Sequence, residues 1–380
     1  MKRILVFLLC CTVFFQCVFA EESDLTPSAS SSILMDAQSG QILYEKNMHE
    51  PLYPASMTKM MSLYLVIKAI HNGNLDWNDQ VVASKHASSM GGSQIYLKEG
   101  EVMSVLDLFK ASTVASANDA ITALAEKVSG TEAAFVELMN KTALEFGCQN
   151  THFVNPTGLH DDHHVSSAYD MALIAKHLLV EGGEDVLKYT SLMEDYIRSD
   201  TESPFWLVNT NKMLRSYPGL DGLKTGYTSQ SGYCITVTAI KDGLRLIAVV
   251  MKEPDKNSRT KDASALLDTG FANYHKDVLI EAHELSETFV IDKGIPASIQ
   301  ITNQTELAMI CRKDERLIEV NRSIEFYISS APVSQNEVVG QITIELQNGR
   351  TISSNLIATQ TVKRLTFWLI FKRCLKEMII

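Results

Sequence analysis

The stretch ASMTKMMSLYLVIKAIH, residues 55–71, predicts a helix that is apolar on nearly every side. Its apolar positions are Met57, Met60, Met61, Leu63, Leu65, Val66, Ile67 and Ile70. A helix at a protein surface keeps a polar face, so a helix without one is buried in the middle of a domain. The neighbouring elements are therefore expected to pack around residues 55–71.

The sequence on both sides predicts strands at the two ends of a mostly helical unit. Ile33–Asp36 and Gln41–Glu45 are strand-like runs joined by a turn, as in a β-hairpin. Gly232–Ile240 and Leu244–Met251 form a second hairpin around the turn Lys241-Asp242-Gly243. Helices are predicted at residues 105–114, 118–129, 132–146, 169–179 and 260–274. The early and late strands are expected to pair in one sheet.

Beyond about residue 277 the pattern changes to short alternating runs separated by turn residues. These runs are residues 287–291, 298–301, 307–311, 323–328, 338–346 and 351–357. They predict a small all-β domain. The predicted organisation is a leader at 21–31, a mixed helical and strand domain at 32–275 and a β-rich domain at 276–360.

The charge of the chain excludes one class of partner. The net charge is −11, but residues 1–20 carry +2 and residues 361–380 carry +4, which leaves −17 on residues 21–360. Nucleic acid is not an expected partner, because phosphates bind a basic surface. Residues 1–20 have the charged start, apolar run and Val18-Phe19-Ala20 end of a secretory signal peptide, and the run is too short for a membrane span.

The basic C-terminal segment, residues 361–380, predicts an amphipathic helix. Phe367, Trp368, Phe371, Cys374, Leu375, Met378 and Ile379 share one face, and Lys372, Arg373 and Lys376 lie roughly opposite. Such a helix lies in a membrane interface and is attracted by anionic lipid. The alternative is a terminal helix docked on its own domain. The first reading predicts an exported protein attached to the outer face of the cytoplasmic membrane.

Four cysteines remain after removal of the signal peptide, namely Cys148, Cys234, Cys311 and Cys374. They are widely spaced and include no C-x-x-C pair, so neither a zinc site nor a disulfide scaffold is indicated. Free, buried thiols are expected, with a single disulfide as the alternative.

Three short strings carry chemistry. Ser56-Met57-Thr58-Lys59 puts a lysine one helical turn from a serine, where it can reach the hydroxyl. Burial would lower the pKa of this lysine and allow it to act as a base. The free N–H groups at a helix N-terminus could stabilise an oxyanion. The same S-x-x-K spacing recurs at Ser258–Lys261, so the string alone is weak evidence for a catalytic pair.

The other two strings are Ser116-Ala117-Asn118, at a helix junction, and Lys224-Thr225-Gly226, at the start of a strand. By itself the first is more typical of an N-cap. The second places a lysine and a threonine where they suit a carboxylate or carbonyl ligand, and its glycine lets a substrate approach the backbone.

The order and context of the strings are more specific than any one of them. S-x-x-K opening a buried helix, S-x-N at a helix junction and K-T-G on a strand resemble the penicillin-interacting serine enzymes. Residues 32–274 resemble the low-molecular-mass penicillin-binding proteins, the serine-type D-alanyl-D-alanine carboxypeptidases of peptidase family S11. The resemblance extends to the strings at residues 155–160, 168–172, 209–211 and 221–228. It implies an α/β domain like that of the serine β-lactamases, with a five-stranded antiparallel sheet flanked by helices.

The resemblance also implies roles. Ser56 is the expected nucleophile, Lys59 the general base and Ser116 a proton relay, while Asn118 holds the substrate amide. Lys224, Thr225 and Gly226 are expected at the substrate's C-terminal carboxylate, assisted by Arg259. The main-chain N–H groups of Ser56 and Tyr227 would form the oxyanion hole. The implied partners are the pentapeptide stems of peptidoglycan and β-lactam antibiotics.

No cofactor and no metal are expected. His160, His163 and His164 lie near Asp161 and Asp162, but nothing in their spacing fixes ligand geometry, and a solvated loop is the preferred interpretation.

Three alternatives stay open at this point. A β-lactamase shares the strings, although no E-x-x-L-N string stands between Asn118 and Lys224 to activate a deacylating water. A DD-endopeptidase would use the same residues on cross-linked stems. A penicillin or peptidoglycan sensor would lack a reacting residue, and none is missing.

Overall fold

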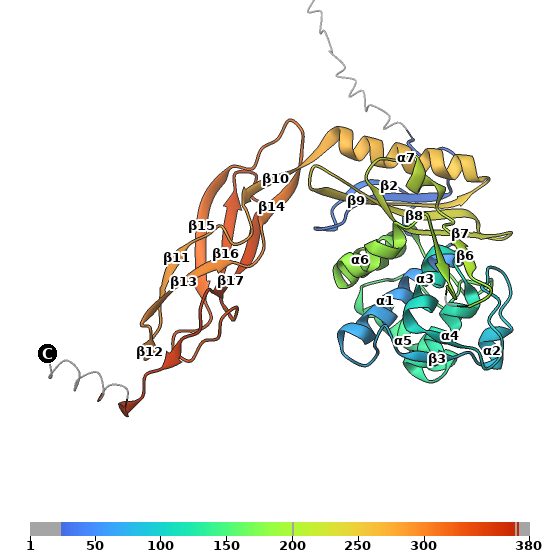
Figure 1. The fold of residues 1–380 in the computed structure, drawn as a ribbon. Coiled ribbons are helices and arrows are strands. Elements are labelled where there is room, and N and C mark those ends of the chain that lie inside the picture. The colour runs from blue at the N-terminus through green and yellow to red at the C-terminus, as the bar shows by residue number, and fades with distance from the viewer. Residues whose placement is uncertain (1–23, 200, 369–370, 372–380) are drawn as a thin grey trace, which may run out of the picture.

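The computed structural model describes residues 24–199, 201–368 and 371, so the predicted signal peptide and Cys374 lie outside the described residues. Two domains follow one another along the chain (Figure 1). The first contains a five-stranded sheet with helices on both faces, and the second is built of strands.

The central sheet of the first domain has the order β2-β1-β9-β8-β7, and every pair is antiparallel. Its strands are β1 (Ser31–Asp36), β2 (Ile42–Lys46), β7 (Leu220–Thr228), β8 (Gly232–Lys241) and β9 (Leu244–Glu253). Ile33 pairs with Val249, which joins the two ends of the domain. The predicted five-stranded antiparallel sheet is confirmed, and β7 is one of its free edges.

Helices cover both faces of this sheet (Figure 1). α7 (Lys256–Asn273) packs on one face, where Leu266 and Leu267 meet the outward side chains of β8 and β9. On the other face lie α1 (Lys59–His71), α3 (Val105–Val114), α4 (Asn118–Ser129), α5 (Glu132–Glu145) and α6 (Ala168–Thr190). α1 contacts each of the other four, and its residues 59–67 are all buried. The apolar stretch therefore forms the centre of the helical layer, as predicted.

Shorter elements complete the first domain, and none of them was predicted from the sequence pattern. They are β3 (Gln80–Val82), α2 (Lys85–Ser88), β4 (Val102–Ser104), β5 (Glu194–Ile197), β6 (Phe205–Val208) and a 3₁₀ turn, η2 (Lys212–Arg215). α6 is also longer than predicted and is kinked at Gly183, whose φ is 43°.

The second domain contains a five-stranded sheet of order β11-β13-β17-β16-β15. Its strands are β11 (Glu287–Val290), β13 (Ser298–Asn303), β15 (Glu319–Phe326), β16 (Val338–Leu346) and β17 (Thr351–Ala358). Two further pairs are β10 (Tyr274–Ile280) with β14 (Leu307–Arg312), and β12 (Gly294–Ile295) with β18 (Lys363–Arg364). The all-β prediction is confirmed.

The start of the C-terminal segment differs from the predicted helix. Val362 is buried in the second domain, and β18 follows it, so residues 361–364 are not helical. Beyond them Phe367, Trp368 and Phe371 are exposed. No helix among the described residues is long and apolar enough to span a membrane.

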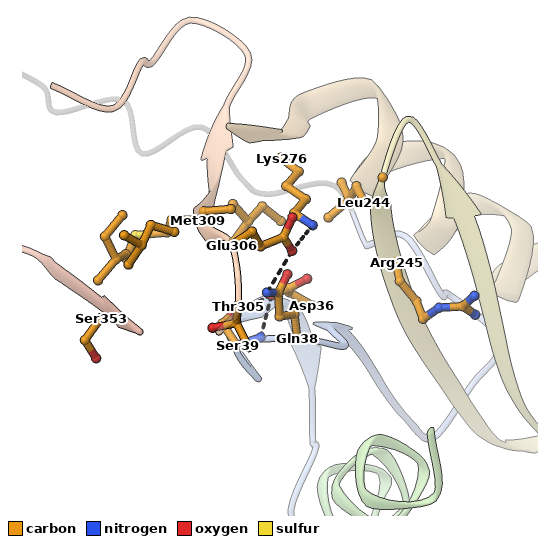
Figure 2. A pocket seen from close by; sticks show the side chains of 15 residues that line it. Asp36, Gln38, Ser39, Leu244, Arg245, Lys276, Thr305, Glu306, Met309 and Ser353 are labelled. Carbon is orange, nitrogen blue, oxygen red and sulfur yellow. Dashed lines mark hydrogen bonds and ion pairs between the residues drawn. The ribbon is translucent and has the colours of Figure 1, made fainter. Parts of the chain in front are cut away.

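The two domains meet at the turn between β1 and β2. Glu306 of the second domain pairs with Lys276 and accepts a hydrogen bond from Gln38 Nε2 at 3.2 Å (Figure 2). These residues line a cavity of about 260 Å³ together with Asp36, Arg245 and others. Within the described part of the chain, Cys148, Cys234 and Cys311 are free and buried, which agrees with the prediction of free thiols for these three.

Candidate active site

The backbone around Ser56 forms a tight turn before the buried helix. Residues Ala55–Thr58 make a 3₁₀ turn, η1, and α1 begins only at Lys59, whereas the sequence predicted one continuous helix from Ala55. Ala55 has a φ of 46°, which is unusual for a residue with a Cβ. Gly158 lies against this turn: a Cβ there would be 1.8 Å from the carbonyl oxygen of Ala55. The strained turn is therefore held by contacts from a distant segment.

Lys59 lies beneath Ser56 and is fully buried. Its Nζ donates to Ser56 Oγ at 3.1 Å, to Asn118 Oδ1 at 2.6 Å and to the carbonyl oxygen of Thr157 at 2.7 Å. Burial and, to a smaller extent, the positive charge of Lys224 hold the pKa of Lys59 well below its usual value. Lys59 can therefore be neutral, and as a neutral amine it can accept a proton from Ser56.

The second string lies at the junction of α3 and α4. Ser116 has a φ of 62° and is buried at the cleft wall. Asn118 is fixed by two bonds to one loop, from its main-chain N–H to the carbonyl of Ser93 and from Nδ2 to the carbonyl of Gly91, each at 2.7 Å. Because Asn118 Oδ1 also accepts from Lys59, the first two strings are joined directly.

The third string lies on the edge strand β7, next to the Ser56 turn. A Cβ on Gly226 would lie 2.7 Å from the carbonyl oxygen of Pro54 and 3.2 Å from the main-chain N of Ser56. Only glycine allows β7 to approach Ser56 this closely. Lys224 Nζ donates to the carbonyl of Thr225 at 3.1 Å. Burial, followed by the nearby charge of Arg259, lowers the pKa of Lys224 to about 7.

Two further predicted residues complete the cleft. Tyr227 is exposed, and its ring stacks on Tyr233 at 4.3 Å. Arg259 is buried in the first turns of α7, and its Nε has no hydrogen-bond partner in the structure. Burial lowers the pKa of this guanidinium. A buried cationic side chain without a full set of acceptors is suited to receive an anionic ligand.

The structure brings all nine predicted residues to one cleft of about 720 Å³. Ser56, Ser116, Thr225, Gly226, Tyr227 and Arg259 line it. Lys59, Asn118 and Lys224 are buried behind this lining.

Several lining residues were given no role by the sequence analysis. Thr210 accepts a hydrogen bond from Thr225 Oγ1 at 2.7 Å, and Ser93, Lys212, Tyr233 and Lys256 also line the cleft. The only sequence signal for Thr210 was its place in the Asn209–Asn211 string.

His164 does not lie in a solvated loop, which corrects the interpretation of the histidine cluster. It is buried behind the Ser56 turn, and its Nε2 is 2.8 Å from Thr58 Oγ1. Its Nδ1 accepts from the main-chain N–H of Val154, so Nε2 carries the proton and donates to Thr58. Burial lowers the pKa of His164 to about 4. Within the described residues no group of three or more His, Cys, Asp or Glu side chains could hold a metal ion.

Comparison with known proteins identifies the family of this chain. The peptidase S11 family model, described as D-alanyl-D-alanine carboxypeptidase, matches residues 18–255. The chain belongs to this family. S11 D-Ala-D-Ala carboxypeptidases are penicillin-binding enzymes, and this chain is one of them.

Two of the relatives cover most of the chain, and a third covers about two thirds of it. The chain is 39% identical over 356 residues to D-alanyl-D-alanine carboxypeptidase DacF of Bacillus subtilis strain 168, covering 93% of this chain and 91% of that protein. Penicillin-binding protein 5 from Haemophilus influenzae aligns with a TM-score of 0.68 and 33% identity, covering 89% of this chain and 98% of that one. Penicillin-binding protein D2 from Listeria monocytogenes, bound to cefotaxime, aligns with a TM-score of 0.58 and 33% identity over 64% of this chain and 97% of its own.

Proposed function

We propose that this carboxypeptidase removes the terminal D-alanine from peptidoglycan pentapeptide stems through an acyl-enzyme on Ser56. The observation that supports it most is the contact between Lys59 Nζ and Ser56 Oγ at 3.1 Å, which joins a fully buried lysine to a serine that lines the cleft. A neutral amine at hydrogen-bond distance is the base that a serine nucleophile requires.

In the proposed acylation, Lys59 takes the hydroxyl proton while Ser56 Oγ attacks the carbonyl carbon between the two D-alanines. The main-chain N–H groups of Ser56 and Tyr227 hold the developing oxyanion. Ser116 gives its proton to the leaving nitrogen and is reprotonated by the Lys59 ammonium, the C–N bond breaks, and D-alanine departs with Lys59 neutral again. Water then attacks the ester, which releases the shortened stem and restores the Ser56 hydroxyl.

Substrate recognition in this proposal uses the other predicted residues. The terminal carboxylate binds near Lys224 and Thr225, with Arg259 supplying charge from α7, and Gly226 lets the peptide lie against β7. Asn118 holds the amide of the preceding residue. A β-lactam ring presents a carbonyl and a carboxylate in a similar relation, and the related Listeria protein has been solved with cefotaxime and with ampicillin bound.

We also propose that the enzyme acts outside the cytoplasmic membrane, with residues 1–20 removed as a signal peptide and residues 366–380 attached to the membrane surface. The exposed Phe367, Trp368 and Phe371 beside Lys363 and Arg364 support this attachment. Vesicles of anionic lipid should bind the chain from residue 21 onward and release it at high salt. Equal binding after removal of residues 366–380 would contradict this part of the proposal.

The catalytic proposal is tested by following the intact mass of the chain from residue 21 onward after addition of benzylpenicillin. The Ser56→Ala variant is treated and measured in parallel. We expect one adduct that lasts minutes or longer in the wild type and none in the variant, together with release of D-alanine from a D-Ala-D-Ala peptide. Rapid loss of the adduct while the drug is consumed would indicate a β-lactamase. A wild-type chain without any adduct would refute Ser56 as the nucleophile.

A further inference from the structure

The charge of the catalytic cleft is opposite to that of the chain. Among its described lining residues, Lys212, Lys256 and Arg259 are cationic and none is Asp or Glu. The chain as a whole has 45 acidic residues against 34 Lys and Arg. A cleft lined by one sign of charge concentrates ligands of the other sign. The cleft is therefore built for an anionic ligand.

Lys212 and Lys256 line the cleft from two different elements, η2 and α7. Lys256 lies three residues before Arg259 on α7, so the two side chains share a face of the helix. Lys212 follows Thr210 by two residues, and Thr210 Oγ1 is 2.7 Å from Thr225 Oγ1. Both lysines thus line the cleft that also contains Thr225 and Arg259, two of the three residues to which the proposed function gives the terminal carboxylate.

These two lysines have no assigned ligand. Both are exposed, and neither forms an ion pair with another described residue. Asp255, beside Lys256, is used as the N-cap of α7 and accepts from the N–H groups of Asn257 and Ser258. A leaving D-alanine carries one carboxylate, which Lys224, Thr225 and Arg259 are sufficient to bind. Lys212 and Lys256 therefore remain available to bind a second negative charge on the ligand.

We propose that Lys212 and Lys256 form a subsite for a second carboxylate on the amine side of the scissile bond. This inference rests on the proposed function, which places the first carboxylate at Lys224, Thr225 and Arg259. Two substrates have the required chemistry. One is a peptide that ends in an acidic D-amino acid, and the other is a cross-linked stem whose leaving part is a second, acidic peptide.

The test compares two peptides of equal size, diacetyl-L-Lys-D-Ala-D-Glu and diacetyl-L-Lys-D-Ala-D-Gln, which differ by one charge in the leaving group. We expect kcat/KM of the full chain to favour D-Glu by about fivefold or more, since two exposed ion pairs are gained, and the preference to fall as salt is added. Lys212→Gln/Lys256→Gln should lose the preference, and Lys212→Arg/Lys256→Arg should keep it. Lys261→Gln, an exposed lysine of the same helix outside the cleft lining, is the matched control.

The rate of acylation by benzylpenicillin separates this inference from the proposed function. Measured at high salt, where the long-range attraction of the cleft for the anionic drug is screened, that rate should be the same in the wild type and the Gln double variant, because the drug has no second carboxylate to bind the subsite. Unchanged acylation with equal D-Glu to D-Gln ratios in both proteins would overturn the subsite and leave the proposed function intact. If the ratio behaves as expected, purified cross-linked muropeptide dimers distinguish the two sources. If the wild type cleaves the dimers and the Gln variant does not, the second carboxylate belongs to a cross-linked stem. If neither protein cleaves the dimers, the second carboxylate belongs to an acidic D-amino acid.

Discussion

The string S-x-x-K occurs twice in this protein, and the two copies have opposite environments. At Ser56–Lys59 the lysine is fully buried and donates to the serine, to Asn118 and to a main-chain carbonyl. At Ser258–Lys261 the lysine is exposed, and Ser258 Oγ donates to the helix-capping carboxylate of Asp255 at 2.8 Å. The spacing is identical, so the spacing does not make a catalytic pair.

Burial makes the difference between the two lysines. Removing an ammonium from water favours its neutral form and turns it into a base, whereas an exposed ammonium stays protonated at neutral pH. Burial of Lys59 requires the packed helical layer around α1 and the loop that carries Thr157. The environment of Lys59 therefore depends on the packing of the whole domain, whereas the environment of Lys261 depends only on its own helix.

The largest difference is expected when the two lysines are replaced in turn. Lys59→Ala should reduce acylation by benzylpenicillin by about 10²–10⁴-fold, the usual contribution of a general base. Lys59→Arg should be nearly as slow, because a guanidinium stays protonated. Lys261→Ala should acylate at the wild-type rate, measured by intact mass over time. A comparable loss in Lys261→Ala would remove the distinction between the two copies.

The turn that holds Ser56 can be disturbed without changing any reacting group. Gly158→Ala puts a Cβ into the carbonyl of Ala55 at a residue whose φ is +81°, so the turn must move, and acylation should slow more than tenfold. The matched control is Gly130→Ala, where φ is +80° and a Cβ would meet open space. Both variants carry the same backbone cost, about 1 kcal/mol by thermal unfolding, but only the first should lose activity.

The pKa of Lys224 predicts how substrate binding depends on pH. Because this pKa is about 7, the cation is present below pH 7 and is lost as the pH rises above it. The Kd of a D-Ala-D-Ala peptide for Ser56→Ala should therefore increase from pH 6 to pH 8.5, by up to about tenfold per unit above 7. Titration calorimetry measures the Kd at each pH. The exposed Lys261 provides the control, since adding Lys261→Gln should leave the dependence of the Kd on pH unchanged. A flat profile in Ser56→Ala would contradict the assignment of Lys224.

The smallest effect is expected at the second serine. Ser258→Ala removes only an exposed hydrogen bond to Asp255, which keeps its bonds to two main-chain N–H groups. Unfolding free energy should fall by less than about 1 kcal/mol, with full acylation by benzylpenicillin. The measurement is thermal unfolding of the variant and the wild type under the same conditions. A loss of acylation in Ser258→Ala would show that the first turn of α7 shapes the cleft.

Much of the fold followed from local patterns. The bounds of α3 and α4 agree with prediction, and the two hairpins of the main sheet were found from their turns. The hairpin of β5 and β6 was missed because each strand has only four residues and depends on packing against α3. β10 was missed because it follows α7 directly, with no turn residues to mark the change.

The candidate site was predictable where residue type and spacing determine it. The three strings gave seven of the nine predicted residues, and the resemblance to the family added Tyr227 and Arg259. The 3₁₀ start at Ala55 was not predictable, because it depends on Gly158, which is distant in sequence. The carbonyl of Thr157 and the hydroxyl of Thr210 contribute through tertiary contacts that no local pattern contains.

The pairing of β1 with β9 has a consequence for folding. Ile33 lies opposite Val249, so the central sheet cannot close until almost the entire first domain has been synthesised. Pairing between such distant segments carries a large loop-closure cost and makes folding slow. Until then the apolar helix α1 is not covered by the sheet, and exposed apolar surface of this kind is prone to aggregation. Ser56 and Lys59 are made early, but they can become a catalytic pair only after β7, β8 and β9 exist.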